Sequence, residues 1–249
     1  MFNFFAKENM LTGNSYTVGG TDYNHIKNVL RMTVGDRFLI SESGKSNLCE
    51  IKTINETEIT AEIVEENYID TSLDISIYLF QGLPKSDKLE LIIQKCVELG
   101  VSGIIPVEME HCVVKLDDKK KKSKTERWQA ISESAAKQSK RSFVPKVYEP
   151  VSFNTVLENI EKLDLFLIPY EAKNGMKDTK SALLKLKKGM NVGILIGPEG
   201  GFAEKEIDKL KTKKCEIISL GKRILRTETA AICTVSMCML YSETELSND

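Results

Sequence analysis

An arginine and a glutamate two positions apart are the side chains of this sequence best suited to chemistry. Arg226-Thr-Glu-Thr229 follows an apolar run that ends at Leu220 and precedes an apolar segment that begins at Ala230. The chain has 29 lysines and only six arginines, so the arginines that remain are candidates for gripping a phosphate, a carboxylate or a base edge with a planar guanidinium. Arg223 lies in the same loop. The alternative is that Arg226 and Glu228 form an ion pair that only fixes the loop.

A glycine-rich loop is the second candidate. Gly197-Pro-Glu-Gly-Gly-Phe202 follows an apolar run that ends at Ile196. Its three glycines let the backbone approach a ligand closely, and the helix expected after it presents free N–H groups. The spacing matches neither the dinucleotide fingerprint nor the P-loop. A tight turn between a strand and a helix is the alternative interpretation.

Both loops belong to a region in which strands and helices alternate, a pattern typical of a parallel α/β sheet. Ligands bind at the carboxyl ends of the strands in such sheets, so these two loops and Pro169-Tyr-Glu171 should face one site. The predicted strands are 75–80, 104–107, 165–168, 192–196 and 216–220. The predicted helices begin at Asp87 and end at Gly100, or span 128–139, 153–162, 181–187, 204–213 and 229–241.

The first seventy residues carry a different pattern. Apolar alternation and short turns over 37–64 predict an antiparallel meander or a small barrel, after one short helix between Asp22 and Leu30. The acidic stretch from Glu65 to Asp74 is expected to be a linker. The sequence therefore predicts two domains, residues 1–70 and residues 73–249.

The composition restricts the class of protein. The chain has 249 residues, 41% hydrophobic and 29% charged, which excludes disordered, collagen-like and membrane-spanning classes. Six cysteines without a C-x-x-C pair indicate buried free thiols in a reducing, cytoplasmic compartment, and two histidines argue against a zinc site. The net charge is −5 over residues 1–70 and +4 over the rest, so any nucleic acid must be bound by a local patch.

Specific motifs then resemble one family over essentially the whole chain. The two long loops, Leu195 to Phe202 and Leu220 to Ala230, resemble the signature loops of the RsmE family of the SPOUT methyltransferase superfamily. Further matching segments are Gln81 to Glu90, Gln94 to Val101, Trp128 to Ser134, Gln138 to Pro145 and, in the first domain, His25 to Arg31.

The resemblance implies a fold and a reaction. It implies an N-terminal PUA-like β-barrel for RNA and a C-terminal α/β domain with a deep trefoil knot. It implies that S-adenosylmethionine is the methyl donor, without a metal, and that the reaction is methylation of uridine N3 in small-subunit ribosomal RNA near the decoding centre. The family acts as a homodimer, and its partner is that RNA or the assembled small subunit. No membrane partner is implied.

The resemblance also implies site residues. Arg226 is the first candidate to stabilise a uridine anion, and Glu228 either takes the proton or orients Arg226. The candidate RNA contacts are Lys27, Arg31 and Arg141, and Arg31 is favoured because it remains in an arginine-poor chain. The lysine tract 119–122 is a weaker candidate, because a run of lysines is usually a solvated loop. The implied cofactor-binding positions are Ile168, Ile196, Gly197, Glu199, Gly201, Leu220, Gly221, Leu225, Arg226, Thr227 and Ala230.

Two departures and two alternatives remain at this stage. The family often has a basic residue near its start, where this chain has Asn3-Phe4-Phe5, and a serine before the helix after the glycine loop, where this chain has Ala203. The alternative functions are a SPOUT methyltransferase acting on transfer RNA and a non-catalytic RNA-binding protein of ribosome assembly. The second predicts RNA affinity without affinity for S-adenosylmethionine.

Overall fold

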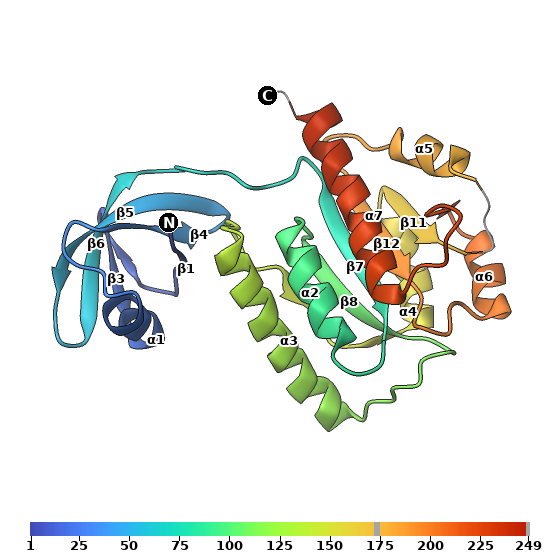
Figure 1. The fold of residues 1–249 in the computed structure, drawn as a ribbon, viewed down its shortest axis with the longest axis horizontal. Coiled ribbons are helices and arrows are strands. Elements are labelled where there is room, and N and C mark those ends of the chain that lie inside the picture. The colour runs from blue at the N-terminus through green and yellow to red at the C-terminus, as the bar shows by residue number, and fades with distance from the viewer. Residues whose placement is uncertain (172–174, 248–249) are drawn as a thin grey trace. The chain divides into compact units, whose positions relative to one another are not determined.

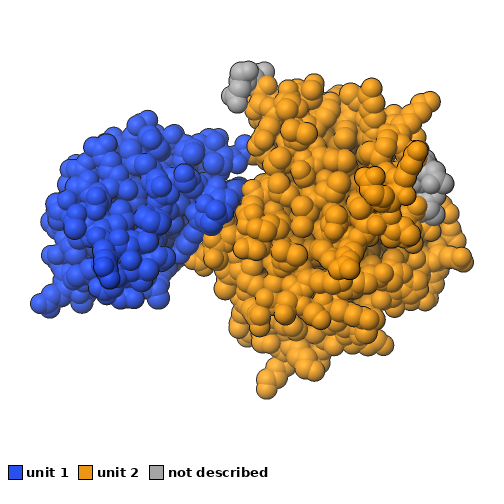
Figure 2. Space-filling model, in the orientation of Figure 1, with its two compact units in different colours: residues 1–72, 136–144 blue, residues 73–135, 145–249 orange. Residues whose placement is uncertain are grey.

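The computed structural model describes residues 1–171 and 175–247, and the chain divides into two compact units. Unit 1 comprises Met1–Ser72 and Ala136–Val144, and unit 2 comprises Leu73–Ala135 and Pro145–Asp249 (Figure 2). The short segment 136–144 therefore packs with the N-terminal unit, although the chain on both sides of it belongs to unit 2.

Unit 1 is built on a six-stranded sheet with the order β1-β4-β5-β6-β3-β2 (Figure 1). The predicted antiparallel meander is confirmed by β4, β5 and β6, whereas β1 joins the edge of β4 in parallel. The bounds are β1 Asn3–Phe5, β2 Leu11–Thr12, β3 Ser15–Gly19, β4 Arg37–Glu42, β5 Lys45–Ile54 and β6 Glu58–Glu65.

The core of unit 1 comes from alternating side chains of these strands. Tyr16, Phe38 and Ile51 are completely buried, and the ring of Phe4 packs edge-on against that of Phe38 at 5.5 Å. The predicted helix at 22–30 starts earlier: α1 covers Gly20–Asn24 and continues as the π-helical turn η1, His25–Val29.

Unit 2 contains a seven-stranded sheet in which every pair is parallel, as the alternation of strands and helices predicts. The main order is β10-β8-β7-β12-β11-β13, and β9 pairs with β8. The trefoil knot itself stays a prediction, because strand order alone does not define the threading. The bounds are β7 Ser76–Gly82, β8 Gly103–Glu108, β9 Lys146–Val147, β10 Val151–Ser152, β11 Leu165–Pro169, β12 Asn191–Ile196 and β13 Glu216–Ile218.

Helices α2 and α7 pack against each other, and α7 also contacts β7 and β12. Helix α4 contacts β8 and β10 instead. The bounds are α2 Lys88–Glu98, α3 Asp118–Gln138, α4 Phe153–Asn159, η2 Ile160–Lys162, α5 Lys177–Leu183, α6 Glu204–Lys211, α7 Thr227–Tyr241 and η3 Ser242–Leu246.

Helix α3 corrects the predicted helix at 128–139. It begins ten residues earlier and includes the lysine tract, residues 119–122. The carboxylate of Asp117 accepts a hydrogen bond from the backbone N–H of Lys120 at 2.8 Å, which caps the first turn. The cap at Asp117 therefore fixes the start of α3. The apolar pattern around Trp128 indicates a helix but not where it begins.

Candidate functional site

Four neighbouring strands of unit 2, in the order β7-β12-β11-β13, end at one edge of the sheet. Because all four run parallel, their carboxyl ends and the loops that follow are adjacent. The predicted positions Ile168 and Ile196 are fully buried near the ends of β11 and β12, so they support the loops from below. This edge is where a ligand is expected in an open α/β sheet.

The glycine loop after β12 is compact. The N–H of Gly201 donates to the carbonyl of Pro198 at 2.9 Å, and Gly201 has a left-handed φ of +67°. On the other side of the loop, a Cβ on Gly82 would lie 2.7 Å from the ring of Pro198. Glycine is therefore required at position 82 for β7 to approach this loop, and at position 201 for the turn.

Helix α6 follows this loop without a capping side chain at Ala203. The carboxylate of Glu206, in the first turn of the helix, satisfies backbone N–H groups instead. It accepts from the N–H of Ala203 at 2.9 Å and from the N–H of Glu110 at 3.0 Å. Glu206 is 4% exposed. The departure at Ala203 is thus compensated by a buried carboxylate at the helix start, where negative charge is favourable.

The loop after β13 is anchored at its first residue and exposed at its tip. Thr179 donates to the carbonyl of Ser219 and accepts from its N–H, at 2.7 and 3.0 Å. Beyond Gly221, whose φ is +103°, the tip is cationic and carries an exposed isoleucine. Its exposed residues are Lys222, Arg223 and Ile224.

The start of α7 ties these loops together. Thr227 is buried, and its hydroxyl donates to the carbonyl of Gly197 at 2.7 Å and accepts from Nε2 of Gln81 at 2.9 Å. The N-cap is Arg226, which makes no side-chain capping bond. The hydroxyl of Thr227 is therefore used between β7 and the glycine loop and does not cap α7.

Arg226 and Glu228 are not joined in an ion pair. Arg226 is exposed, and no ion pair involves its guanidinium among the residues that the structure describes. Glu228 is half-buried, and its Oε2 lies 3.6 Å from Nζ of Lys88 on α2. The alternative of a loop-fixing Arg226–Glu228 pair is thus not what the structure contains, and Arg226 is available to a substrate.

Lys88 also contacts Glu199 of the glycine loop, at 3.0 Å. The backbone N–H of Lys85 donates to the same carboxylate at 3.0 Å. Burial raises the pKa of Glu199, but the hydrogen bonds from Lys88 and from backbone N–H groups outweigh it, so the pKa lies below its ordinary value. The hydrogen bond with Glu199 in turn raises the pKa of Lys88. Both groups stay charged at neutral pH.

The remaining predicted cofactor positions fit a ligand held by backbone. With respect to residues 1–171 and 175–247, Gly201 and Gly221 have open space where a Cβ would stand, apart from Oε1 of Glu171 at 3.7 Å from the first. Four further positions are half-buried, namely Leu220, Gly221, Leu225 and Ala230. Two glycines with room at the Cβ position let a ligand approach the backbone closely.

The predicted RNA contacts all lie in unit 1. Arg31 is exposed, and its φ of +54° places it in a left-handed turn after η1. Lys27 is half-buried and donates to the hydroxyl of Tyr23 and to the carbonyl of Asn55.

Arg141 is a different case from the other two. It is only 3% exposed, its guanidinium lies 4.7 Å from the ring of Phe143, and desolvation lowers its pKa to about 10. Its backbone carbonyl accepts from Nδ2 of Asn3 at 3.0 Å. Arg141 is thus packed inside unit 1 beside Phe143, and its role as an RNA contact stays a prediction.

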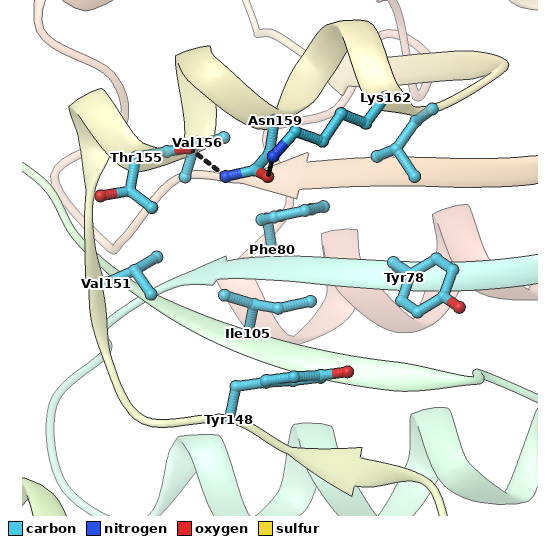
Figure 3. Close-up of a pocket in the computed structure, with 10 residues that line it drawn as sticks. Tyr78, Phe80, Ile105, Tyr148, Val151, Thr155, Val156, Asn159 and Lys162 are labelled. Atoms are coloured by element: carbon cyan, nitrogen blue, oxygen red, sulfur yellow. Dashed lines mark hydrogen bonds between the residues drawn. The ribbon is translucent and has the colours of Figure 1, made fainter.

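A cavity of about 260 Å³ lies elsewhere in unit 2, between the sheet and α4 (Figure 3). Tyr78 and Phe80 of β7 line it, as does Val156 of α4. Gln81 of the same strand contacts Thr227 on α7, and successive strand residues face opposite sides of a sheet. The cavity thus opens on the face away from α7, and it contains none of the predicted site residues.

Residues 1–171 and 175–247 contain neither a metal-binding cluster nor a membrane-spanning helix. No group of three or more histidine, cysteine, aspartate or glutamate side chains is arranged to hold a metal ion there. None of the described helices combines the length and hydropathy needed to cross a membrane.

Comparison with family models gives two matches. The model described as an RNA methyltransferase domain matches residues 71–239, and the model described as an RNA methyltransferase PUA domain matches residues 18–64. The first covers more than half of the chain. It includes every loop of the candidate site.

Relatives with names extend the match to nearly the full length. The chain is 38% identical to ribosomal RNA small subunit methyltransferase E of Bacillus subtilis, over 96% of this chain and 94% of that one. It is 31% identical to the protein of the same name from Aquifex aeolicus, over 97% and 100%. A solved structure of that methyltransferase from Neisseria gonorrhoeae, bound to S-adenosylmethionine, is 28% identical with a TM-score of 0.81, over 98% and 99%.

Sequence reasoning missed two side chains of the site. Gln81 and Lys88 both lie in the segment 81–90 that resembles the family, but the residues were assigned to a loop and a helix start without a role. Gln81 is the second-last residue of β7 and is completely buried. Neither side chain has a local signal in the sequence, because their partners, Thr227 and Glu199, lie far away along the chain.

Proposed function

The chain belongs to the ribosomal RNA small subunit methyltransferase E family, and from this membership we propose that it transfers a methyl group from S-adenosylmethionine to N3 of a uridine in small-subunit ribosomal RNA, near the decoding centre. The observation that carries the proposal is the site at the β12 and β13 strand ends. There Arg226 stands exposed at the start of α7, without an ion pair to any described residue, and Thr227 joins this helix to the glycine loop.

The cofactor loops have a defined task in this proposal. S-adenosylmethionine, when bound, supplies an electrophilic methyl group on a sulfonium. The backbone around Gly197, Gly201 and Gly221 holds the adenosine part, and Leu220 and Leu225 exclude water from it. Rigid loops matter because correct placement of two reactants supplies a large part of the rate.

The nucleotide side of the reaction falls to Arg226. Uridine N3 carries a weakly acidic proton, so the base must lose this proton before or as the N–C bond forms. A guanidinium near O2 or O4 stabilises the charge that develops on the ring. Glu228 is the candidate proton acceptor, or the proton leaves to solvent.

Nucleoside mapping tests the proposal directly. Ribosomal RNA from cells with and without this protein is digested, and methylated nucleosides are located by mass spectrometry. We expect one N3-methyluridine in small-subunit RNA that disappears without the protein. A methylated transfer RNA, or unchanged RNA together with RNA affinity but no cofactor affinity, would instead support one of the two alternatives.

Unit 1 supplies RNA contacts in this proposal, chiefly through Arg31 and Lys27. We expect Arg31→Ala to weaken the binding of small ribosomal subunits by several-fold. The slope of log K against log salt concentration should become less steep by ~0.9, the value for one lost phosphate contact. Alanine keeps the strain of the left-handed backbone, so stability should hardly change. Filter binding across salt concentrations measures this. Equal loss of cofactor affinity in a folded variant would show that Arg31 is structural.

A homodimer is the second expectation under this function. Helix α7 buries Ala231, Val235 and Cys238 inside its own unit, while Leu240 is 56% exposed and Leu91 on the adjoining α2 is 43% exposed. Apolar side chains on two packed helices suit a second copy of the chain. We expect sedimentation at micromolar concentration to give twice 28.0 kDa, and a mass of 28.0 kDa would refute the dimer.

A further inference from the structure

We propose that Lys88 is a positioning residue of the methyl transfer: its ammonium group holds the Glu228 carboxylate away from Arg226, and so keeps Arg226 available for the uridine. The inference rests on the proposed function and adds a residue for which the motif comparison gives no role. It starts from three charged groups on three elements, namely Lys88 at the start of α2, Glu199 in the glycine loop and Glu228 in the first turn of α7.

Lys88 lies between the two carboxylates. Its Nζ is 3.0 Å from Oε1 of Glu199 and 3.6 Å from Oε2 of Glu228. The side chain of Lys88 is 31% exposed, and that of Glu228 only 14%. This is therefore not an isolated ion pair on the surface, which would contribute little. It is one cation shared by two carboxylates at the edge of the site.

Glu228 depends on this cation more than Glu199 does. Glu199 also accepts from the backbone N–H of Lys85. The Oε2 atom of Glu228 is buried and accepts no hydrogen bond from the described residues, so Lys88 is its only cation there. Removing one partner of a buried charge pair leaves the other charge uncompensated, which is costly. Without Lys88 the Glu228 carboxylate must find another cation.

Arg226 is the nearest cation along the chain, two residues before Glu228 and exposed. A carboxylate that turned to Arg226 would bind its planar fork in the bidentate geometry that carboxylates favour. That pairing would neutralise the group that stabilises the uridine anion. Lys88 prevents it, because a charge already compensated on the α2 side gains little by moving.

The test is a double-mutant cycle on single-turnover methylation of unmodified small subunits, at saturating S-adenosylmethionine. Lys88→Met removes the charge and keeps the length of the side chain. We expect its rate to fall about 10- to 100-fold, with cofactor affinity by calorimetry within threefold of wild type. In a Glu228→Gln background the same change should cost less than twofold, because there is no carboxylate left to capture Arg226.

Two further variants complete the design. Lys88→Arg keeps the cation and should recover most of the lost rate. Lys95→Met serves as the matched control, because Lys95 lies on the same helix and pairs with Glu98 outside the site, so its rate should equal that of wild type. Thermal unfolding checks that each variant is folded, and Lys88→Gln replaces Lys88→Met if the latter is not.

The possible results separate this inference from the proposed function. An inactive wild-type protein would refute the function itself. An active wild type with an equally active Lys88→Met would refute the role of Lys88, as would the same fold-loss in both backgrounds, a loss confined to cofactor affinity, or no recovery in Lys88→Arg. A loss that vanishes in the Glu228→Gln background establishes that Lys88 acts through Glu228.

Discussion

Arg226→Lys slows methyl transfer by ~10²-fold or more, if the guanidinium stabilises the uridine anion as we propose. The substitution keeps the charge but removes the planar fork, and a lysine does not replace an arginine where two donors must face one group. The side chain of Arg226 is exposed and makes no ion pair among the described residues, so the change should cost little stability. Single-turnover rates on unmodified small subunits measure the effect.

Cofactor affinity is the second measurement on this variant. It should stay close to that of wild type, because the contact of α7 with the glycine loop is made by Thr227 and not by the side chain of Arg226. Arg127→Lys is the matched control: Arg127 donates to Glu90 on the outside of unit 2, and its replacement should leave the rate unchanged. A wild-type rate in Arg226→Lys would show that the loop only binds the cofactor. Catalysis would then depend only on the correct placement of cofactor and uridine.

Gly201→Val is expected to weaken the binding of S-adenosylmethionine by roughly 10- to 100-fold. Among the residues that the structure describes, a Cβ at this position would meet only Oε1 of Glu171, at 3.7 Å, so the added atoms do not clash with the described part of the glycine loop. We propose that the cofactor uses the space at this position. The left-handed φ of +67° adds backbone strain of ~1–2 kcal/mol, since a β-branched residue disfavours it.

Gly189→Val separates the effect of bulk from that of strain. Gly189 has a φ of +83° and open space around its Cα, but it lies before β12 at the opposite end of that strand from the site. It should lose a comparable amount of stability in thermal unfolding and keep full cofactor affinity by calorimetry. Wild-type affinity in a folded Gly201→Val protein would remove Gly201 from the cofactor site.

Periodicity was sufficient where a local pattern reflects a buried face. The strands of unit 2 are short apolar runs because both faces of a parallel sheet are covered, and β7, β8, β11 and β12 appear within one or two residues of their predicted bounds. The candidate loops were also found from sequence, because glycines and charges that directly follow such runs must lie at the carboxyl edge.

Other elements gave no readable local signal. Strands β9 and β10 have two residues each, and β1 has three, so no alternation can develop over their length. They are strands because the edges of β8 and β4 offer unpaired backbone groups. The early start of α3 depends on a single cap at Asp117 in a tract that otherwise reads as solvated lysines.

The sequence by itself determined the family, the α/β class of the C-terminal part and the loops that form the candidate site. Motif residues and apolar runs are local in the chain, and they keep their meaning wherever the segments are placed. The tertiary structure decided which charges meet. In the folded chain Arg141 is buried, and Glu228 lies next to Lys88 instead of pairing with Arg226. Thr227 forms hydrogen bonds with both Gln81 and Gly197. These partners are far apart in sequence, and electrostatic and hydrogen-bond energies depend on distance and burial, which only the folded chain defines.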